Sequence, residues 1–288
     1  DRSNAIGYEN ETHNQDANAI GTVNNAKGWN SNAIGSSNIA SGQQSSAIGH
    51  ANKVLGHYST AVGFSNKANA ESSAFGLENT ASGINSSALG YRNNASGLNS
   101  SAVGFRNITA KTASNAIGSR NEATGTLSNA IGSGVNNTVL TYNGNGEITS
   151  IDGIAISTTA KTIATLSAGN ITAMDGNNAP TTNQKNAFIQ AVRTATGINT
   201  ASGVAATAVG FGNTASGELG TAVGYSNLTN GYASSAVGHA NTAQGQNSSA
   251  VGYKNNASWY SNAIGSENNA TGNYTSSIGY SNNTIANN

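Results

Sequence analysis

The residues that could carry out catalysis or bind a metal are few and scattered in this chain of 288 residues. Cysteine is absent, which removes thiolate metal ligands and cysteine nucleophiles. Histidine occurs at positions 13, 50, 57 and 239, and aspartate at positions 1, 16, 152 and 175. No histidine has metal-ligand spacing to another histidine or to a carboxylate, and four aspartates are too few for calcium-binding nonapeptide repeats. We therefore expect no catalytic residues, no metal site and no cofactor.

The most regular charged residues are Arg92, Arg106 and Arg120, which are spaced by 14 residues. If the chain makes one turn in every 14 residues, their guanidinium groups form a row with a spacing of about 4.8 Å. Such a row suits acidic or extended ligands, such as matrix proteins or sulfated glycans. The alternative, which we favour, is a solvated stripe whose repulsion Glu78 and Glu122 relieve. The three arginines remain candidate partner-binding residues.

Composition excludes several classes of function. Twelve Lys and Arg balance twelve Asp and Glu, so the net charge is +0 and no basic nucleic-acid-binding surface is expected. No run of about 18 apolar residues and no secretory signal pattern occurs, so we expect no direct membrane contact by this chain. Ile, Val, Leu and Phe make up 46 residues, or 16% of the chain, below the roughly 20% at which disorder becomes a possibility. The chain is either disordered or has a core that needs few large side chains.

A 14-residue repeat decides between these two possibilities. Each of sixteen copies reads Asn, Ser or Thr, then Ala (Ser in one copy), then an aliphatic residue or Phe, then Gly, and an Asn follows three residues later in fifteen of them. The residues before the sixteen glycines are Ile6, Ile20, Ile34, Ile48, Val62, Phe75, Leu89, Val103, Ile117, Ile131, Val209, Val223, Val237, Val251, Ile264 and Ile278. A copy of this length is too short for a helical hairpin but can hold two short strands and two tight turns. Glycine is expected at each corner, where φ is positive.

Coils of this size are predicted to stack about 4.8 Å apart as an all-β, parallel β-solenoid. The repeated Asn is expected to form a hydrogen-bonded ladder, and the aromatic residues after the Gly, with His50 and His239 among them, an edge stack. Ala and the aliphatic residue alternate, so they point to opposite faces of the strand. A two-strand coil is too thin to bury both apolar faces. We therefore expect an obligate homo-oligomer in which the second face is buried against copies of the same chain, with the copy number left open. The sixteen aliphatic and Phe side chains are the expected core or inter-chain packing residues.

This pattern resembles the head repeat of the YadA-like trimeric autotransporter adhesins of Gram-negative bacteria, a type V secretion family. Residues 115–118 (Asn-Ala-Ile-Gly) and 268–272 (Asn-Asn-Ala-Thr-Gly) carry the resemblance, which covers about 1–133 and 196–288. It implies a left-handed β-roll, a homotrimer, and a position on a stalk outside the outer membrane at the bacterial cell surface. No signal peptide, neck, heptad pattern or membrane anchor is found, so we expect an excised head.

The repeat stops for about sixty residues in the middle of the chain. The expected parts are a first array of about ten coils at 1–133, an insertion at 134–195, and a second array of six to seven coils at 196–288. Within the insertion, residues 139–149 predict a β-hairpin that contains Tyr142, and residues 183–195 predict a short helix that contains Phe188. Insertions in solenoids often carry binding residues, so Tyr142 and Phe188 are candidate partner contacts. The alternative, which we favour, is that the insertion packs on the coils or on a neighbouring chain.

Together these features, through the resemblance, predict a non-enzymatic adhesin head that binds host extracellular-matrix proteins or cell-surface receptors. Weak contacts repeated along the coils and across the chains would add into avidity. An inert spacer or a self-association (autoagglutination) module is the alternative. A β-helix acyltransferase fits less well because its hexapeptide period and catalytic histidine are missing. An ice-binding solenoid needs a regular Thr face, whereas Thr, Ser and Asn are mixed here.

Overall fold

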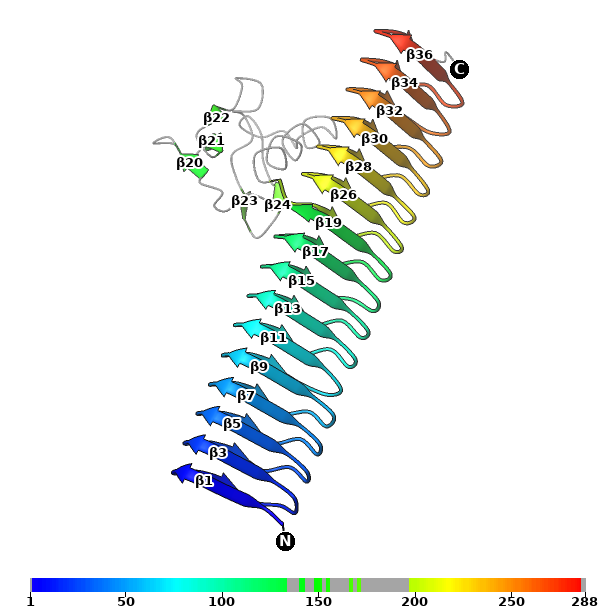
Figure 1. Ribbon diagram of the computed structural model, residues 1–288. Coiled ribbons are helices and arrows are strands. Elements are labelled where there is room, and N and C mark those ends of the chain that lie inside the picture. The colour runs from blue at the N-terminus through cyan, green and yellow to red at the C-terminus, as the bar shows by residue number, and fades with distance from the viewer. Residues whose placement is uncertain are drawn as a thin grey trace. The chain divides into compact units, whose positions relative to one another are not determined.

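The computed structural model describes residues 2–133 and 197–285, together with five short strands between them. The described residues form strands and turns and contain no helix, which confirms the predicted all-β parallel solenoid (Figure 1). The chain divides into two compact units, one made of Asp1–Ile131 with Ala201–Ala206, the other of Gly132–Thr200 with Thr207–Asn288. No helix in these described parts is both long and apolar enough to cross a membrane.

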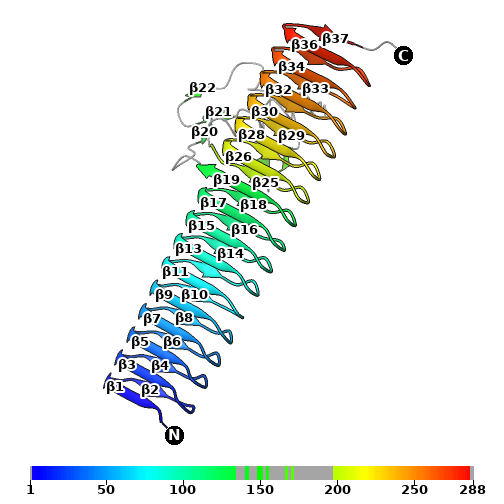
Figure 2. The ribbon, with the colours of Figure 1, turned by 45° about the vertical axis from the view of Figure 1, so that its right-hand side comes forward.

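Each coil contributes one five-residue strand and one two-residue strand. Before the insertion the long strands are β1 (Asn4–Tyr8), β3 (Asn18–Thr22), β5 (Asn32–Ser36), β7 (Ser46–His50), β9 (Thr60–Phe64), β11 (Ser73–Leu77), β13 (Ser87–Tyr91), β15 (Ser101–Phe105), β17 (Asn115–Ser119) and β19 (Asn129–Ser133). The short strands are β2 (Glu11–Thr12), β4 (Asn25–Ala26), β6 (Ile39–Ala40), β8 (Lys53–Val54), β10 (Lys67–Ala68), β12 (Thr80–Ala81), β14 (Asn94–Ala95), β16 (Ile108–Thr109) and β18 (Glu122–Ala123). Figure 2 shows the short strands stacked beside the long ones.

The coils after the insertion repeat this plan. Their long strands are β26 (Thr207–Phe211), β28 (Thr221–Tyr225), β30 (Ser235–His239), β32 (Ser249–Tyr253), β34 (Asn262–Ser266) and β36 (Ser276–Tyr280). Their short strands are β25 (Thr200–Ala201), β27 (Thr214–Ala215), β29 (Leu228–Thr229), β31 (Thr242–Ala243), β33 (Asn256–Ala257), β35 (Asn269–Ala270) and β37 (Asn283–Thr284).

The strands pair in parallel and in register, so that each repeat position lies beside the same position of the next coil. Ile6 of β1 pairs with Ile20 of β3, and Ala33 of β5 with Ala47 of β7. In the 13-residue copy after Gly63 this register is kept, because the missing residue falls in the turn between β10 and β11. The repeat therefore sets the pairing, and the turns absorb the variation in length.

Small side chains fill the interior of each coil. Ala33 of β5 and Ala40 of β6 have no exposed surface, and their counterparts in most other coils are equally buried. Ser45, in the turn between them and the next long strand, is also buried and donates its hydroxyl to the Gly42 carbonyl at 2.6 Å. An interior of methyl groups and short polar side chains explains how 16% of bulky apolar residues is enough for this fold.

The predicted asparagine ladder is present in both units. The Nδ2 amide of Asn38 donates to Oδ1 of Asn24 at 3.0 Å, to the Ile34 carbonyl at 3.0 Å and to the Gly49 carbonyl at 2.7 Å. Its backbone N–H donates to Oδ1 of Asn24 at 3.1 Å. Because Asn38 has no exposed surface, these bonds satisfy polar atoms that would otherwise be costly to bury.

The predicted role of glycine at the corners is wrong. Gly21 lies inside strand β3 with φ of +120°, and a Cβ atom there would be 2.0 Å from the Gly35 carbonyl oxygen of the next coil. The repeat glycine is therefore needed because the stacked strands approach closely.

The turns themselves mostly use residues other than glycine in the left-handed conformation. Val23, two residues after Gly21, has φ of +56°, and Gly197 and Gly212 are exceptions to this pattern. The N–H of Val23 donates to the Tyr8 carbonyl of the preceding coil at 2.8 Å. Stacking of the coils thus holds a conformation that costs an L-residue about 1–2 kcal/mol.

Residues Ala201–Ala206, which follow the insertion, stack on the last coil before it and belong to the first unit. The amides of Thr124 and Asn129 donate to the carbonyls of Ala201 and Ala206 at 2.9 and 2.8 Å. The described strands between the arrays are β20 (Leu140–Tyr142), β21 (Ile148–Ile151), β22 (Ile154–Ala155), β23 (Leu166–Ser167) and β24 (Asn170–Ile171). β20 pairs antiparallel with β21, and the turn of the hairpin predicted at 139–149 lies outside the described residues. The predicted helix at 183–195, with Phe188, also lies outside them.

Candidate functional site

Aromatic side chains stack at the corner where several of the long strands end. In the first unit His50 lies 5.0 Å from Phe64, ring centre to ring centre, and the two planes are 16° apart. In the second unit His239 lies 4.8 Å from Tyr225 and 5.1 Å from Tyr253, in edge-to-face geometry. The prediction that these two histidines belong to an edge stack is confirmed. Among the described residues, no group of three or more His, Asp or Glu side chains could hold a metal ion.

The three candidate arginines lie next to this aromatic stack. Arg92, Arg106 and Arg120 occupy the left-handed turn position of consecutive coils, with φ between +53° and +56°. The guanidinium carbon of Arg92 lies 4.9 Å from the Tyr91 ring centre. Those of Arg106 and Arg120 lie 5.3 and 5.7 Å from the Phe105 ring centre. We call these five residues the arginine corner; cation–π contacts orient its charges.

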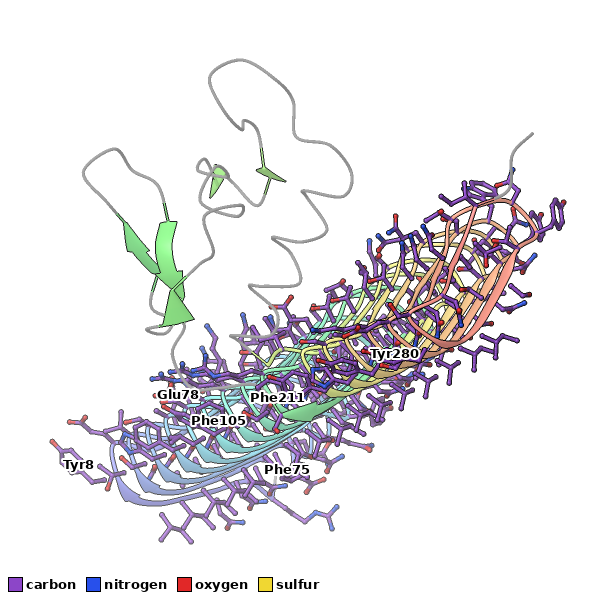
Figure 3. The ribbon with its side chains drawn as sticks, turned by 90° about the horizontal axis from the view of Figure 1, so that it is seen from above. Tyr8, Phe75, Glu78, Phe105, Phe211 and Tyr280 are labelled. Carbon is purple, nitrogen blue, oxygen red and sulfur yellow. The ribbon has the colours of Figure 1, made fainter. Side chains whose placement is uncertain are left out.

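One arginine of this corner also has an acidic partner. Nε of Arg92 donates to Oε2 of Glu78, in the coil before it, and both side chains are about four-tenths exposed (43% and 37%). This hydrogen bond lowers the pKa of Glu78 and raises that of Arg92. The pair relieves part of the repulsion along the row, as the solvated-stripe interpretation expected, and solvent screening keeps its contribution to stability small. Figure 3 marks Glu78 and Phe105.

At Arg120, at the end of the row, burial has the largest effect on the pKa of the guanidinium group. Burial lowers the pKa of Arg120, and the charge of Arg106 lowers it further. An arginine remains protonated at neutral pH despite such a shift, so the corner keeps its positive charges.

In each unit an apolar stripe runs along the outer face of the long strands. The residues before the repeat glycines point away from the alanine interior; Leu89 is 49% exposed and Ile117 is 42% exposed in the first unit. In the second unit Val237 and Ile264 are 37% and 39% exposed. We call these sixteen side chains the aliphatic stripe. An exposed apolar surface of this regularity is typical of an interface.

The structure does not unite all the candidate residues. It brings the three arginines together with Tyr91 and Phe105, whereas Tyr142 lies in β20 with a side chain that is not described, and Phe188 lies outside the described residues. One similar pair was missed: Nζ of Lys254 lies 5.0 Å from the Tyr253 ring centre, and their hydrogen bond raises the pKa of Lys254. An aromatic residue followed by a cation after the repeat Gly is the signal that would have found it.

The fold and these surfaces define a repetitive β-solenoid with an apolar outer stripe and a cationic, aromatic corner. The YadA head domain repeat model matches residues 26–52, 40–66, 55–74, 81–107, 201–227 and 230–255. No curated protein gives a significant match. The matched residues therefore carry YadA-like head repeats of the trimeric autotransporter adhesin type, as the repeat pattern predicted.

The YadA head family consists of non-enzymatic adhesin domains, and YadA-like heads form trimers. Its members belong to cell-surface autotransporter adhesins. The family suggests an adhesin-type function and does not name a ligand.

Proposed function

We propose that this chain is a non-enzymatic adhesin head that binds host extracellular-matrix proteins or cell-surface receptors as a homotrimer. In this proposal three left-handed β-rolls pack together at the bacterial surface, outside the outer membrane. The observation that carries it is the aliphatic stripe, because a single chain leaves side chains such as Leu89 and Ile117 about half exposed. Burial of the exposed half of each would contribute about 0.7–1.5 kcal/mol.

The arginine corner is the proposed contact with the partner. Arg92, Arg106 and Arg120 repeat along the stacked coils, and a trimer would present three such corners. Guanidinium groups held against aromatic rings are suited to acidic side chains of an extended partner. Three weakly binding corners on one particle would raise the apparent affinity through avidity. Tyr142 and Phe188 stay as further candidate contacts.

Adhesion of the purified chain to immobilised collagen, fibronectin and laminin, and to host cells, tests this proposal. The triple substitution Arg92→Ser, Arg106→Ser, Arg120→Ser should weaken binding by tenfold or more, since about 1.4 kcal/mol corresponds to tenfold. The matched control is Lys53→Ser, Lys67→Ser, Lys111→Ser, which removes the same charge elsewhere in the first unit. Equal adhesion of both variants contradicts the arginine corner. If neither the wild type nor the variants adhere, the head is favoured as an inert spacer. If cells that carry the head clump together, a role in self-association is favoured.

A further inference from the structure

A depression with an exposed tryptophan lies on a different corner of the first unit, at the turn that follows the short strands. It has a volume of about 460 Å³. Its lining residues come from four consecutive coils: Asn14, Lys27, Gly28, Trp29, Ser41, Gln43 and His57. At about 4.8 Å per coil, it extends about 14 Å along the stack. That length fits an oligomer better than a single small molecule.

The tryptophan side chain is exposed to solvent, while its backbone is held by a hydrogen bond to the next coil. Trp29 is 54% exposed, and its carbonyl accepts a hydrogen bond from the Gln44 amide of the next coil at 2.7 Å. Gly28 beside it is buried, and a Cβ atom there would lie 1.9 Å from the Gly42 carbonyl oxygen. The position before Trp29 therefore has no side chain, so only backbone lines the depression there.

Hydrogen-bonding groups line the same depression. The backbone N–H of Gln43 donates to Nδ1 of His57 at 2.9 Å, so the proton of that imidazole is on Nε2. The Gln43 amide and the Ser41 hydroxyl add both donors and acceptors. An aromatic face flanked by such groups matches a pyranose ring, which has an apolar C–H face and a rim of hydroxyl groups.

The charge of the lining residues indicates which class of sugar would bind. Lys27 is exposed, and the seven lining residues include no carboxylate. The lining thus offers a ligand one ammonium group and no carboxylate, which favours an anionic sugar over a neutral one.

We propose that the Trp29 depression is a binding site for an acidic glycan, with one pyranose ring stacked on the indole of Trp29 and a carboxylate or sulfate group paired with Lys27. It uses none of the residues of the arginine corner and lies off the aliphatic stripe. It is independent of the proposed adhesion to proteins, since it can be tested with the purified chain and oligosaccharides alone.

Tryptophan fluorescence provides a direct test, because the chain has two tryptophans. In the Trp259→Phe variant all indole emission comes from Trp29. Titration with hyaluronan hexasaccharide, which carries only carboxylates, and with heparin hexasaccharide, which also carries sulfates, should change this emission saturably. Maltohexaose, which is neutral, should bind about tenfold more weakly. In Trp29→Phe, where only Trp259 reports, neither acidic sugar should change the emission.

Calorimetry on single variants supplies the controls. Trp29→Ala should weaken the binding of the acidic hexasaccharides by about tenfold. Lys27→Ala should abolish the preference of the chain for these sugars over maltohexaose. Trp259→Ala is the matched control, because Trp259 is equally exposed at 53%, and it should bind like wild type. Thermal unfolding of each variant checks that it is folded. Three outcomes would overturn the proposal: no binding of any hexasaccharide, equal binding of maltohexaose, or binding that survives Trp29→Ala and is lost in the triple arginine variant.

Discussion

Oδ1 of Asn38 accepts two hydrogen bonds from Asn52 in the next coil, from its backbone N–H at 3.1 Å and from its Nδ2 amide at 3.0 Å. The same double contact recurs from coil to coil in each unit, for example between Asn79 and Asn93 and between Asn227 and Asn241. A buried amide is thus both a donor and an acceptor for its neighbours, so loss of one asparagine affects the coils on both sides.

Asn79→Ala should lower the free energy of unfolding by about 2–4 kcal/mol, because it leaves the Phe75 and Gly90 carbonyls without the buried donor they have now. Urea unfolding followed by circular dichroism measures the change. Asn94→Ala is the control, since Asn94 is exposed on the short strand β14 and should change stability by less than about 0.5 kcal/mol. Equal effects would contradict the ladder as a source of stability.

Gly21→Ala should destabilise the first unit by about 3 kcal/mol or more. Its Cβ atom would meet the Gly35 carbonyl oxygen at 2.0 Å, and φ of +120° is unfavourable for alanine. Reduced thermal stability, or expression only in insoluble form, is the expected result. A variant as stable as wild type would show that the coils can separate at this point without cost.

Val23→Asn should stabilise the chain by about 0.5–1 kcal/mol. Val23 is a β-branched residue at φ of +56°, and its side chain is 45% exposed, so little apolar burial is lost. Asparagine tolerates this conformation better. Thermal unfolding measures the gain, and Val23→Thr, which keeps the β-branch, should show none of it.

Glu78→Gln should remove a contribution to stability that depends on pH. Because Arg92 lowers the folded-state pKa of Glu78 below its ordinary value of 4.5, the ion pair stabilises the fold above that value, and this is lost as pH falls through the folded-state pKa. The difference in melting temperature between wild type and Glu78→Gln should be small at pH 7, shrink in high salt, and vanish at strongly acidic pH. A difference that grows on acidification would contradict the sign of the shift.

Ile117→Asp should break the proposed trimer. It places a charge on the aliphatic stripe, where burial against other chains would be very unfavourable. Light scattering after size exclusion should give three times 28.7 kDa for wild type and a lower mass for this variant. Ile108→Asp is the matched control, because Ile108 is similarly exposed (37% against 42%) but lies on the short strand β16. Wild type at 28.7 kDa would contradict the oligomer.

Sequence by itself determined the coil, the opposite facing of Ala and the aliphatic residue, and the asparagine ladder. A residue type repeated every 14 positions must lie beside itself in stacked coils, so Asn24, Asn38 and Asn52 had to form a row. Periodicity also indicated the aliphatic stripe and the rows of aromatic and arginine residues, since each occupies one repeat position. Periodicity misassigned the repeat glycine, because only the path of the backbone shows that a Cβ atom on Gly21 would lie 2.0 Å from the next coil.

Only the tertiary structure decided how neighbouring rows meet. The contact of both Arg106 and Arg120 with Phe105 depends on side-chain directions at a left-handed turn, and residue spacing carries no information on them. The Trp29 depression likewise needs Lys27, Gln43 and His57 from three coils around one backbone floor. None of these residues repeats, so periodicity could not single them out; the fold brings them together because each coil rises only about 4.8 Å.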